Sequence, residues 1–193
     1  MGLIRVIGGE LRGRRFRVPD RGVRPTSERA REAVFDILGP SLLSGARVLD
    51  LYAGSGALGI EALSRGAAFA DFAEGSRSVA RTLEQNLESL GLSTRGRVHV
   101  TDLDRATLTV PGPWSVVFLD PPYDGDAGVR WLATLAATVW PDGGGLVVYE
   151  RRSGTPVKAP AELVLKTERE YGDAAVAFYR TGGPSGPTSQ GGS

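Results

Sequence analysis

The chain has 193 residues, of which 41% are hydrophobic and 23% charged, and its net charge of +1 is typical of one ordinary globular domain. It contains no cysteine, which excludes disulfides, thiolate metal sites and a cysteine nucleophile. No apolar run approaches the roughly 20 residues that span a bilayer, and the N-terminus lacks a signal-peptide core, so we expect a cytoplasmic protein.

The first 40 residues are predicted to form a small extension of the main domain. Residues 3–18 alternate loosely between apolar and charged positions, which indicates a hairpin with arginines on one face. A helix with apolar residues at helical spacing follows, capped by Thr26 or Ser27, and Gly39-Pro40 is expected to stop it.

Positive charge is concentrated in this extension. Residues 1–31 hold nine arginines and three acids, a local charge of +6, which leaves −5 for the rest of the chain. A basic arm on a mildly acidic body suggests a polyanionic partner. The alternative is a solvated arginine-rich face in a chain that has only two lysines, and charge alone leaves the two interpretations close to even. The candidate contact residues are Arg5, Arg12, Arg14, Arg15, Arg17 and Arg24.

From residue 47 onward the pattern alternates between strand and helix. Apolar runs predict strands at residues 47–51, 69–74, 97–101, 115–119 and 145–149. Helices are predicted at about 57–65, over Val79, Leu83, Leu87 and Leu90, and over Val129, Leu132, Leu135, Ala136 and Val139, with a short, weakly helical piece after the third strand. Two final strands, near 162–168 and 174–180, are joined by a short turn and should pair antiparallel.

Continuous apolar strands that alternate with amphipathic helices indicate a Rossmann-like α/β fold. We expect a mostly parallel seven-stranded sheet with helices on both faces and an antiparallel pair of strands at its C-terminal end. This domain should cover residues 41–181 and act as a monomer. Residues 182–193 offer nothing apolar to bury and are expected to be disordered.

A glycine loop follows the strand at 47–51. Gly54 to Gly59 matches the G-x-G-x-x-G pattern, in which a turn without side chains lets backbone N–H groups approach a nucleoside. Glu74 lies twenty residues after Gly54, a spacing that also suits a nicotinamide dinucleotide. Asp50 separates the two readings, because it would repel a pyrophosphate but attract the cationic amino group of S-adenosylmethionine.

Three acids stand at the ends of three successive predicted strands, the edge where open α/β sheets bind ligands. Asp50 would face the methionyl end of the cofactor, Glu74 its ribose and Asp102 its adenine amine. The structural alternatives are a loop cap, an exposed strand-end acid and an ordinary turn aspartate, respectively. No metal is expected, and the candidate cofactor contacts are Asp50, Tyr52, Ala53, Gly54, Ser55, Gly56, Glu74, Gly75, Asp102, Leu103 and Thr26.

The sequence Asp120-Pro121-Pro122-Tyr123, called the catalytic turn below, follows the apolar run that ends at Leu119. An exocyclic base amine is a poor nucleophile, because its lone pair is delocalised into the ring. The Asp120 carboxylate and a backbone carbonyl between the prolines can accept its two N–H bonds and aim the lone pair, while Tyr123 can stack on the base. The alternative is a plain strand-ending turn. Methylation at cytosine C5 is excluded, because that reaction usually needs a cysteine.

These motifs resemble the RsmD-type family of ribosomal RNA guanine-N2 methyltransferases, which modify one guanine of bacterial 16S rRNA. The resemblance covers residues 3–181 and is carried by Arg5-Val6-Ile7-Gly8-Gly9, Arg12-Gly13-Arg14, Arg24-Pro25-Thr26, Arg31-Glu32-Ala33-Val34-Phe35, the loop from Asp50 to Gly56, and the catalytic turn. It implies the class I methyltransferase fold, cofactor contacts at Asp50, Gly54, Glu74 and Asp102, base contacts at Asp120 and Tyr123, and a substrate base displayed on a small subunit. Gly75-Ser76 departs from the family pattern, where a charged residue is frequent.

Two other functions are considered. A DNA adenine-N6 methyltransferase uses a similar catalytic turn but usually carries a target-recognition region, for which this chain has little room. A nicotinamide-dependent dehydrogenase would suit the glycine spacing but not Asp50. Among the remaining residues, His99 and the three tryptophans are expected to be structural. Glu150, at the end of the fifth predicted strand, could help to shape the site, but a salt bridge with Arg151 or Arg152 is the favoured interpretation.

Overall fold

The computed structural model describes residues 2–19, 28–107, 109–123 and 125–181. Seven of its strands form one sheet in the order β5-β4-β3-β6-β7-β9-β8. Their bounds are β3 (Arg47–Leu51), β4 (Phe69–Glu74), β5 (Gly96–Val100), β6 (Val116–Leu119), β7 (Leu146–Arg152), β8 (Leu163–Tyr171) and β9 (Ala174–Thr181). The strands β3 to β7 run parallel to one another, whereas β9 is antiparallel to both β7 and β8, as the sequence predicts.

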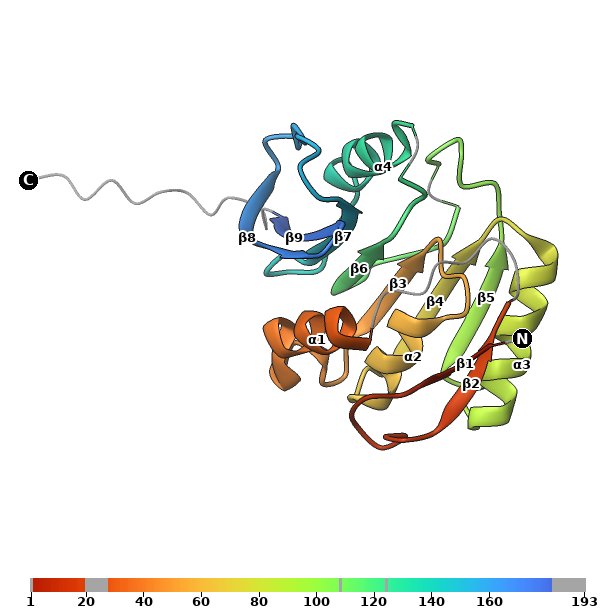
Figure 1. The fold of residues 1–193 in the computed structure, drawn as a ribbon. Helices are drawn as coiled ribbons and strands as arrows, with labels where there is room; N and C mark the ends of the chain where they lie inside the picture. The colour runs from red at the N-terminus through yellow and green to blue at the C-terminus, as the bar shows by residue number, and fades with distance from the viewer. Residues whose placement is uncertain (1, 20–27, 108, 124, 182–193) are drawn as a thin grey trace, which may run out of the picture.

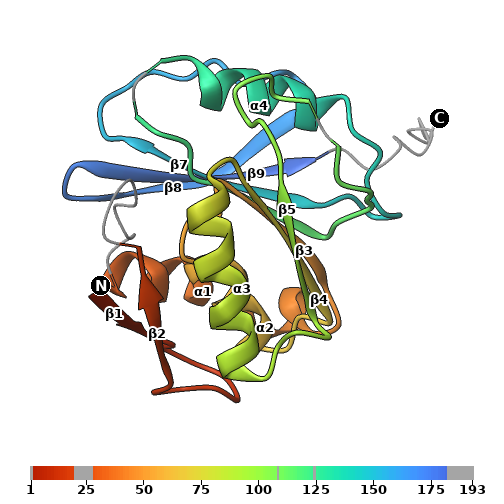
Figure 2. The same cartoon turned by 90° about the vertical axis from the view of Figure 1, so that its right-hand side faces the viewer.

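The sheet is covered on both faces, which explains why its central strands are apolar throughout. Side chains of a strand alternate between faces, so Val116 and Phe118 of β6 enter one core while Val117 and Leu119 enter the other. The first core lies under α1 (Glu28–Leu43), α2 (Ala57–Ser64) and α3 (Arg77–Leu90), and the second lies under α4 (Ala127–Ala136). Figures 1 and 2 show α4 on the opposite side of the sheet from the other three helices.

The N-terminal hairpin consists of β1 (Gly2–Arg5) and β2 (Arg15–Val18), which pair antiparallel. It lies against α2 and α3 (Figure 1). Two buried polar side chains hold it there. Glu61 of α2 accepts hydrogen bonds from the backbone N–H groups of Ile7 (2.8 Å) and Gly8 (2.7 Å). Asn86 of α3 both accepts from and donates to the backbone of Arg17.

The helical regions differ from the prediction in some details. The first helical segment ends at Gly39, whose φ of 69° is not helical, as predicted, but a second segment runs from Pro40 to Leu43 and completes α1. Val129 lies in α4 as predicted, although it is 44% exposed, whereas Val139, 83% exposed, lies beyond the end of α4. The described residues between β5 and β6 form turns, bends and irregular segments in place of the predicted helical piece.

Other expectations concern residues outside the described part of the chain, namely the helix cap at Thr26 or Ser27 and the tail at 182–193. Within the described part, no helix combines the length and the apolar character needed to cross a membrane.

Candidate active site

The predicted site residues meet at the point where the order in which strands are added to the sheet changes from one side of β3 to the other. From β3 the sheet grows through β4 and β5 on one side, whereas β6 and β7 extend it on the other. The carboxyl ends of β3 and β6 therefore lie side by side, with Leu51 paired to Leu119. Such a switch point is where open α/β sheets bind their ligands.

The glycine loop that leaves β3 is tightly enclosed. A Cβ atom at Gly56, whose φ is 84°, would lie 2.3 Å from a methyl carbon of Leu83. At Gly59 it would lie 2.2 Å from the ring of Phe72. Both contacts are shorter than carbon atoms tolerate, so Gly56 lets α3 approach the loop and Gly59 lets α2 pack closely on β4. Asn86 adds a hydrogen bond of 3.1 Å from its amide to the carbonyl of Ser55.

Asp50 lies beneath this loop with only 2% of its surface exposed. One of its carboxylate oxygens accepts a 2.9 Å hydrogen bond from the N–H of Gly59. Burial raises the pKa of Asp50 to about 8; the Gly59 hydrogen bond opposes this shift and the charge of Glu74 adds to it. The structure therefore gives Asp50 the loop-capping role that the sequence offered as the alternative, and its contact with a cofactor stays a prediction.

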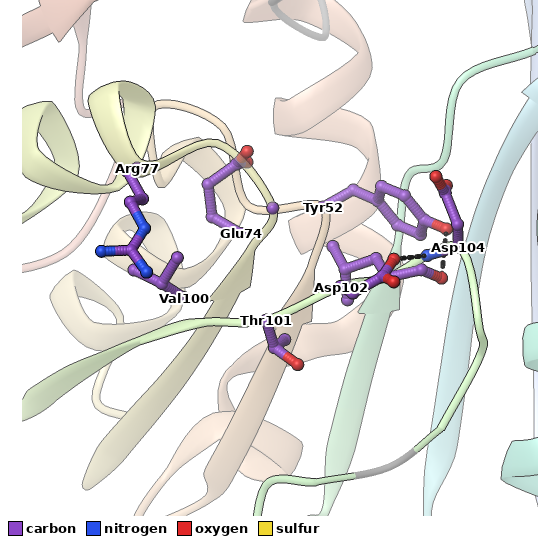
Figure 3. A pocket seen from close by; sticks show the side chains of 9 residues that line it. Tyr52, Glu74, Arg77, Val100, Thr101, Asp102 and Asp104 are labelled. Atoms are coloured by element: carbon purple, nitrogen blue, oxygen red, sulfur yellow. Dashed lines mark hydrogen bonds between the residues drawn. The ribbon is translucent and has the colours of Figure 1, made fainter.

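Glu74 connects the ends of β4 and β3. Its carboxylate accepts hydrogen bonds from the backbone N–H groups of Gly54 (3.0 Å) and Ser76 (2.8 Å). The side chain is half-buried and borders a pocket of about 490 Å³ (Figure 3). The pocket is lined by Tyr52, Glu74, Gly75, Arg77, Val100, Thr101, Asp102, Leu103 and Asp104.

This pocket brings together five of the predicted cofactor residues from three separate segments, namely Tyr52, Glu74, Gly75, Asp102 and Leu103. Asp50, Ala53, Gly54, Ser55 and Gly56 belong to β3 and to the loop that follows it and do not line the pocket, whereas Thr26 lies outside the described residues. Sequence reasoning missed Arg77, Val100, Thr101 and Asp104. Of these, only Val100 gave a signal in the sequence, because it is an apolar residue near the end of a predicted strand. In the structure it is 49% exposed.

The side of the pocket between β3 and β5 is held by an aromatic pair. The Tyr52 hydroxyl donates to the carbonyl of Leu103 (3.0 Å), and the indole N–H of Trp131 reaches both that carbonyl (3.0 Å) and the Tyr52 oxygen (3.2 Å). Tyr52 has a positive φ of 60°, a strained conformation for a residue with a side chain. Asp102 is 58% exposed at the pocket and forms an ion pair of 3.3 Å with Arg105.

The catalytic turn begins directly beside this loop. The backbone nitrogen of Asp120 lies 3.5 Å from the carbonyl oxygen of Leu51, the last residue of β3. Within the turn, Pro121 is buried, Pro122 is exposed, and Asp120 and Tyr123 are half-buried. Residues from the glycine loop and from the catalytic turn thus share one edge of the sheet.

Glu150 contacts the catalytic turn, in line with the less favoured of its two predicted roles. Its carboxylate accepts a 3.0 Å hydrogen bond from the hydroxyl of Tyr123, where the sequence suggested a salt bridge with Arg151 or Arg152. Arg151 instead pairs with Glu168 at 2.7 Å, and the Arg152 guanidinium lies 5.9 Å from the centre of the Tyr123 ring. His99 is structural as predicted, since its Nε2 atom lies 2.9 Å from the buried Asp71 carboxylate.

The arginines of the hairpin region are exposed, as predicted. Arg5, Arg12, Arg14, Arg15 and Arg17 all face solvent, whereas Arg24 lies outside the described residues. Arg14 donates to the carbonyl of Ser89 (2.9 Å), near the C-terminal end of α3, and Arg5 pairs with Glu28 at 2.6 Å. Because α3 begins at the pocket with Arg77, Arg14 lies near the far end of that helix from the site.

The chemistry of the site suits a nucleoside that carries a cation. Its pocket combines acidic side chains with an exposed apolar one, and the glycine loop is joined to it by the hydrogen bond from Gly54 to Glu74. Among the described residues, no group of three or more histidines and acids is placed to hold a metal ion.

Comparison with known proteins gives one consistent result. The family model "Conserved hypothetical protein 95" matches residues 4–180. The chain is 38% identical to ribosomal RNA small subunit methyltransferase D of Escherichia coli, over 93% of this chain and 90% of that protein. It is 34% identical to the putative rRNA methyltransferase YlbH of Bacillus subtilis, over 93% and 100%. A solved structure, the putative methyltransferase yhhF of E. coli, aligns with a TM-score of 0.83 and 36% identity over 93% of this chain and 98% of that one.

Proposed function

The chain belongs to the RsmD-type family of small-subunit ribosomal RNA methyltransferases, and from this we propose that it methylates the exocyclic N2 amine of a guanine in 16S rRNA with S-adenosylmethionine as donor. The observation that carries the proposal is the backbone contact between Asp120 and Leu51. It brings the turn that would hold the amine next to the strand whose loop would hold the methyl donor. Neither motif would suffice if it stood at another edge of the sheet.

The pocket residues fit S-adenosylmethionine, which would supply an electrophilic methyl group on a positively charged sulfur. Glu74 offers carboxylate oxygens to a ribose, and Asp102 can accept from the adenine amine. Exposed Val100 offers an apolar contact to the adenine ring. Asp50, buried beneath the loop, would contribute negative charge near the methionyl end, and a cation there would favour its ionised form.

The catalytic turn would act by orienting the amine. The Asp120 carboxylate and the carbonyl between the two prolines would accept its N–H bonds, which leaves the nitrogen lone pair free to point toward the donor. Once N2 carries the methyl group it becomes acidic, and its proton can pass to a carboxylate oxygen of Asp120 or to water. Such positioning can contribute about 7–11 kcal/mol to catalysis, so a strong base is not required.

The exposed hairpin arginines would contact rRNA phosphates, with the small ribosomal subunit or an assembly intermediate as partner. The basic arm supports this contact with RNA, since its five described arginines all face solvent. We further propose that the enzyme works as a cytoplasmic monomer.

Calorimetry with S-adenosylhomocysteine and NAD side by side tests the cofactor. We expect binding of S-adenosylhomocysteine alone, whereas a preference for NAD would support a dehydrogenase. Asp120→Ala should keep the affinity for S-adenosylhomocysteine and abolish methyl transfer. Asp142→Ala, an exposed aspartate in a distant turn, serves as the control and should keep both.

A further inference from the structure

The end of β7 extends past the end of β6 toward the catalytic turn. The last residue of β7 that pairs with β6 is Tyr149, opposite Leu119. The next three residues of β7 remain in register with β9, where Arg152 pairs with Ala174. This antiparallel support holds the end of β7 rigidly beside the turn that follows β6.

Strand alternation then directs side chains of β7 to different faces. Glu150 and Arg152 lie on one face, and Arg151 lies on the other, where it binds Glu168. The two side chains on the first face both contact Tyr123. Glu150 accepts its hydroxyl at 3.0 Å, and the Arg152 guanidinium lies over its ring at 5.9 Å from the centre.

These contacts restrict the ring in complementary ways. Glu150 is 9% exposed, so its carboxylate is a fixed acceptor, and a hydrogen bond to a charged group is stronger than one between neutral groups. Arg152 covers one face of the ring, a favourable arrangement for a cation on an aromatic surface. Together they fix the hydroxyl end of Tyr123 and the orientation of its ring.

We propose that Glu150 and Arg152 are positioning residues that orient the Tyr123 ring for stacking on the target base. This inference rests on the proposed function. It predicts that the methylated amine is placed by the ring of Tyr123 as well as by Asp120. Neither Glu150 nor Arg152 needs to touch the reacting atoms.

The test measures kcat and KM for methylation of small subunits that lack the modification. Glu150→Ala and Arg152→Ala should each lower kcat/KM about tenfold, with unchanged affinity for S-adenosylhomocysteine. Glu150→Gln should recover much of the loss, because its amide oxygen still accepts from the hydroxyl. Glu170→Gln and Arg169→Ala, exposed residues of the same types on β8, should behave as wild type.

A double-mutant cycle separates positioning from a general structural effect. In a Tyr123→Phe background the hydroxyl is gone, so Glu150→Ala should cost clearly less activity than it costs in the wild-type background; losses that multiply in full would overturn the proposal. Tyrosine ring signals in NMR, assigned with Tyr123→Phe, should broaden or shift for Tyr123 in Glu150→Ala and Arg152→Ala. A Tyr123 signal that keeps its wild-type position and width in both variants would also overturn it.

These readouts distinguish the inference from the function on which it rests. A wild-type enzyme that methylates guanine N2, together with Glu150 and Arg152 variants of full activity, would overturn the inference alone. A wild-type enzyme that methylates no guanine N2 in the subunit would remove the proposed function, and the positioning role would fall with it.

Discussion

The carboxylate of Glu74 accepts a hydrogen bond from the backbone N–H of Gly54, with 3.0 Å between oxygen and nitrogen. This bond joins the end of β4 to the glycine loop after β3. The side chain that would bind the ribose therefore also helps to set the shape of the loop that would enclose the cofactor. Cofactor affinity should depend on this single residue more than on any exposed acid of α3.

Glu74→Ala should weaken binding of S-adenosylhomocysteine at least about tenfold, because it removes the ribose acceptor and loosens the loop. Glu74→Gln should fall between wild type and alanine, since it keeps one carbonyl acceptor. Isothermal calorimetry measures both, and Glu84→Ala on the exposed side of α3 provides the control. Equal affinity in Glu74→Ala and wild type would remove Glu74 from the cofactor site.

The raised pKa of Asp50 predicts a pH-dependent stability. Because burial raises this pKa from 3.8 to about 8, the folded protein binds the proton more tightly than the unfolded chain. The contribution of protonated Asp50 to the free energy of unfolding is fully present below about pH 4 and is lost as the pH rises toward about 8. Asp50→Asn cannot titrate, so its free energy of unfolding should fall less than that of wild type across this range.

Urea denaturation at a series of pH values measures this difference, which can reach about 1.4 kcal/mol for each pH unit. All other titrating groups are common to the two proteins and cancel in the comparison. Parallel curves for wild type and Asp50→Asn would show that Asp50 ionises normally in the folded protein.

Asn86 connects the hairpin, α3 and the glycine loop. Its side-chain amide binds the backbone of Arg17 on one side and the carbonyl of Ser55 on the other, and it is 1% exposed. Asn86→Ala should lower the free energy of unfolding by about 1–3 kcal/mol, since buried backbone groups lose their partners. Gln85→Ala, the exposed neighbour, should change it by less than about 0.5 kcal/mol. A loss in Asn86→Ala no larger than in this control would contradict the connecting role.

The hairpin arginines should contribute to RNA binding and not to cofactor binding. Replacing Arg12, Arg14 and Arg15 by glutamate should weaken RNA association and flatten its dependence on salt, because fewer counterions are released. The matched control replaces Lys158, Lys166 and Arg169, exposed residues on the other side of the molecule, by glutamate. Filter binding at several salt concentrations measures both, and equal effects would indicate that net charge alone matters.

The sequence predicted the central sheet well because its strands are buried on both faces. In β3 and β4 an apolar run ends at a glycine loop or a helix cap, so their bounds matched the prediction at both ends. The segment between β5 and β6 failed, because its isolated apolar residues, Leu103, Ala106 and Val110, are buried without forming a helix.

The site was less predictable where function depends on contacts between distant residues. The strand-end rule located Glu74 and Asp102, but nothing local distinguishes Glu150, bound to Tyr123, from an exposed strand-end acid. The same holds for Glu61, a helical glutamate that is fully buried because the hairpin backbone covers it. Such partners are set by the tertiary fold, not by spacing along the chain.

The central claim is that methyl transfer reaches the N2 atom of one guanine through the turn that begins beside Leu51. Its most direct test supplies small subunits from a deletion strain with tritiated S-adenosylmethionine and maps the label at nucleotide resolution. We predict label on N2 of a single 16S guanine with wild-type enzyme and none with Asp120→Ala. Label on an adenine, or equal labelling by both proteins, would contradict the account.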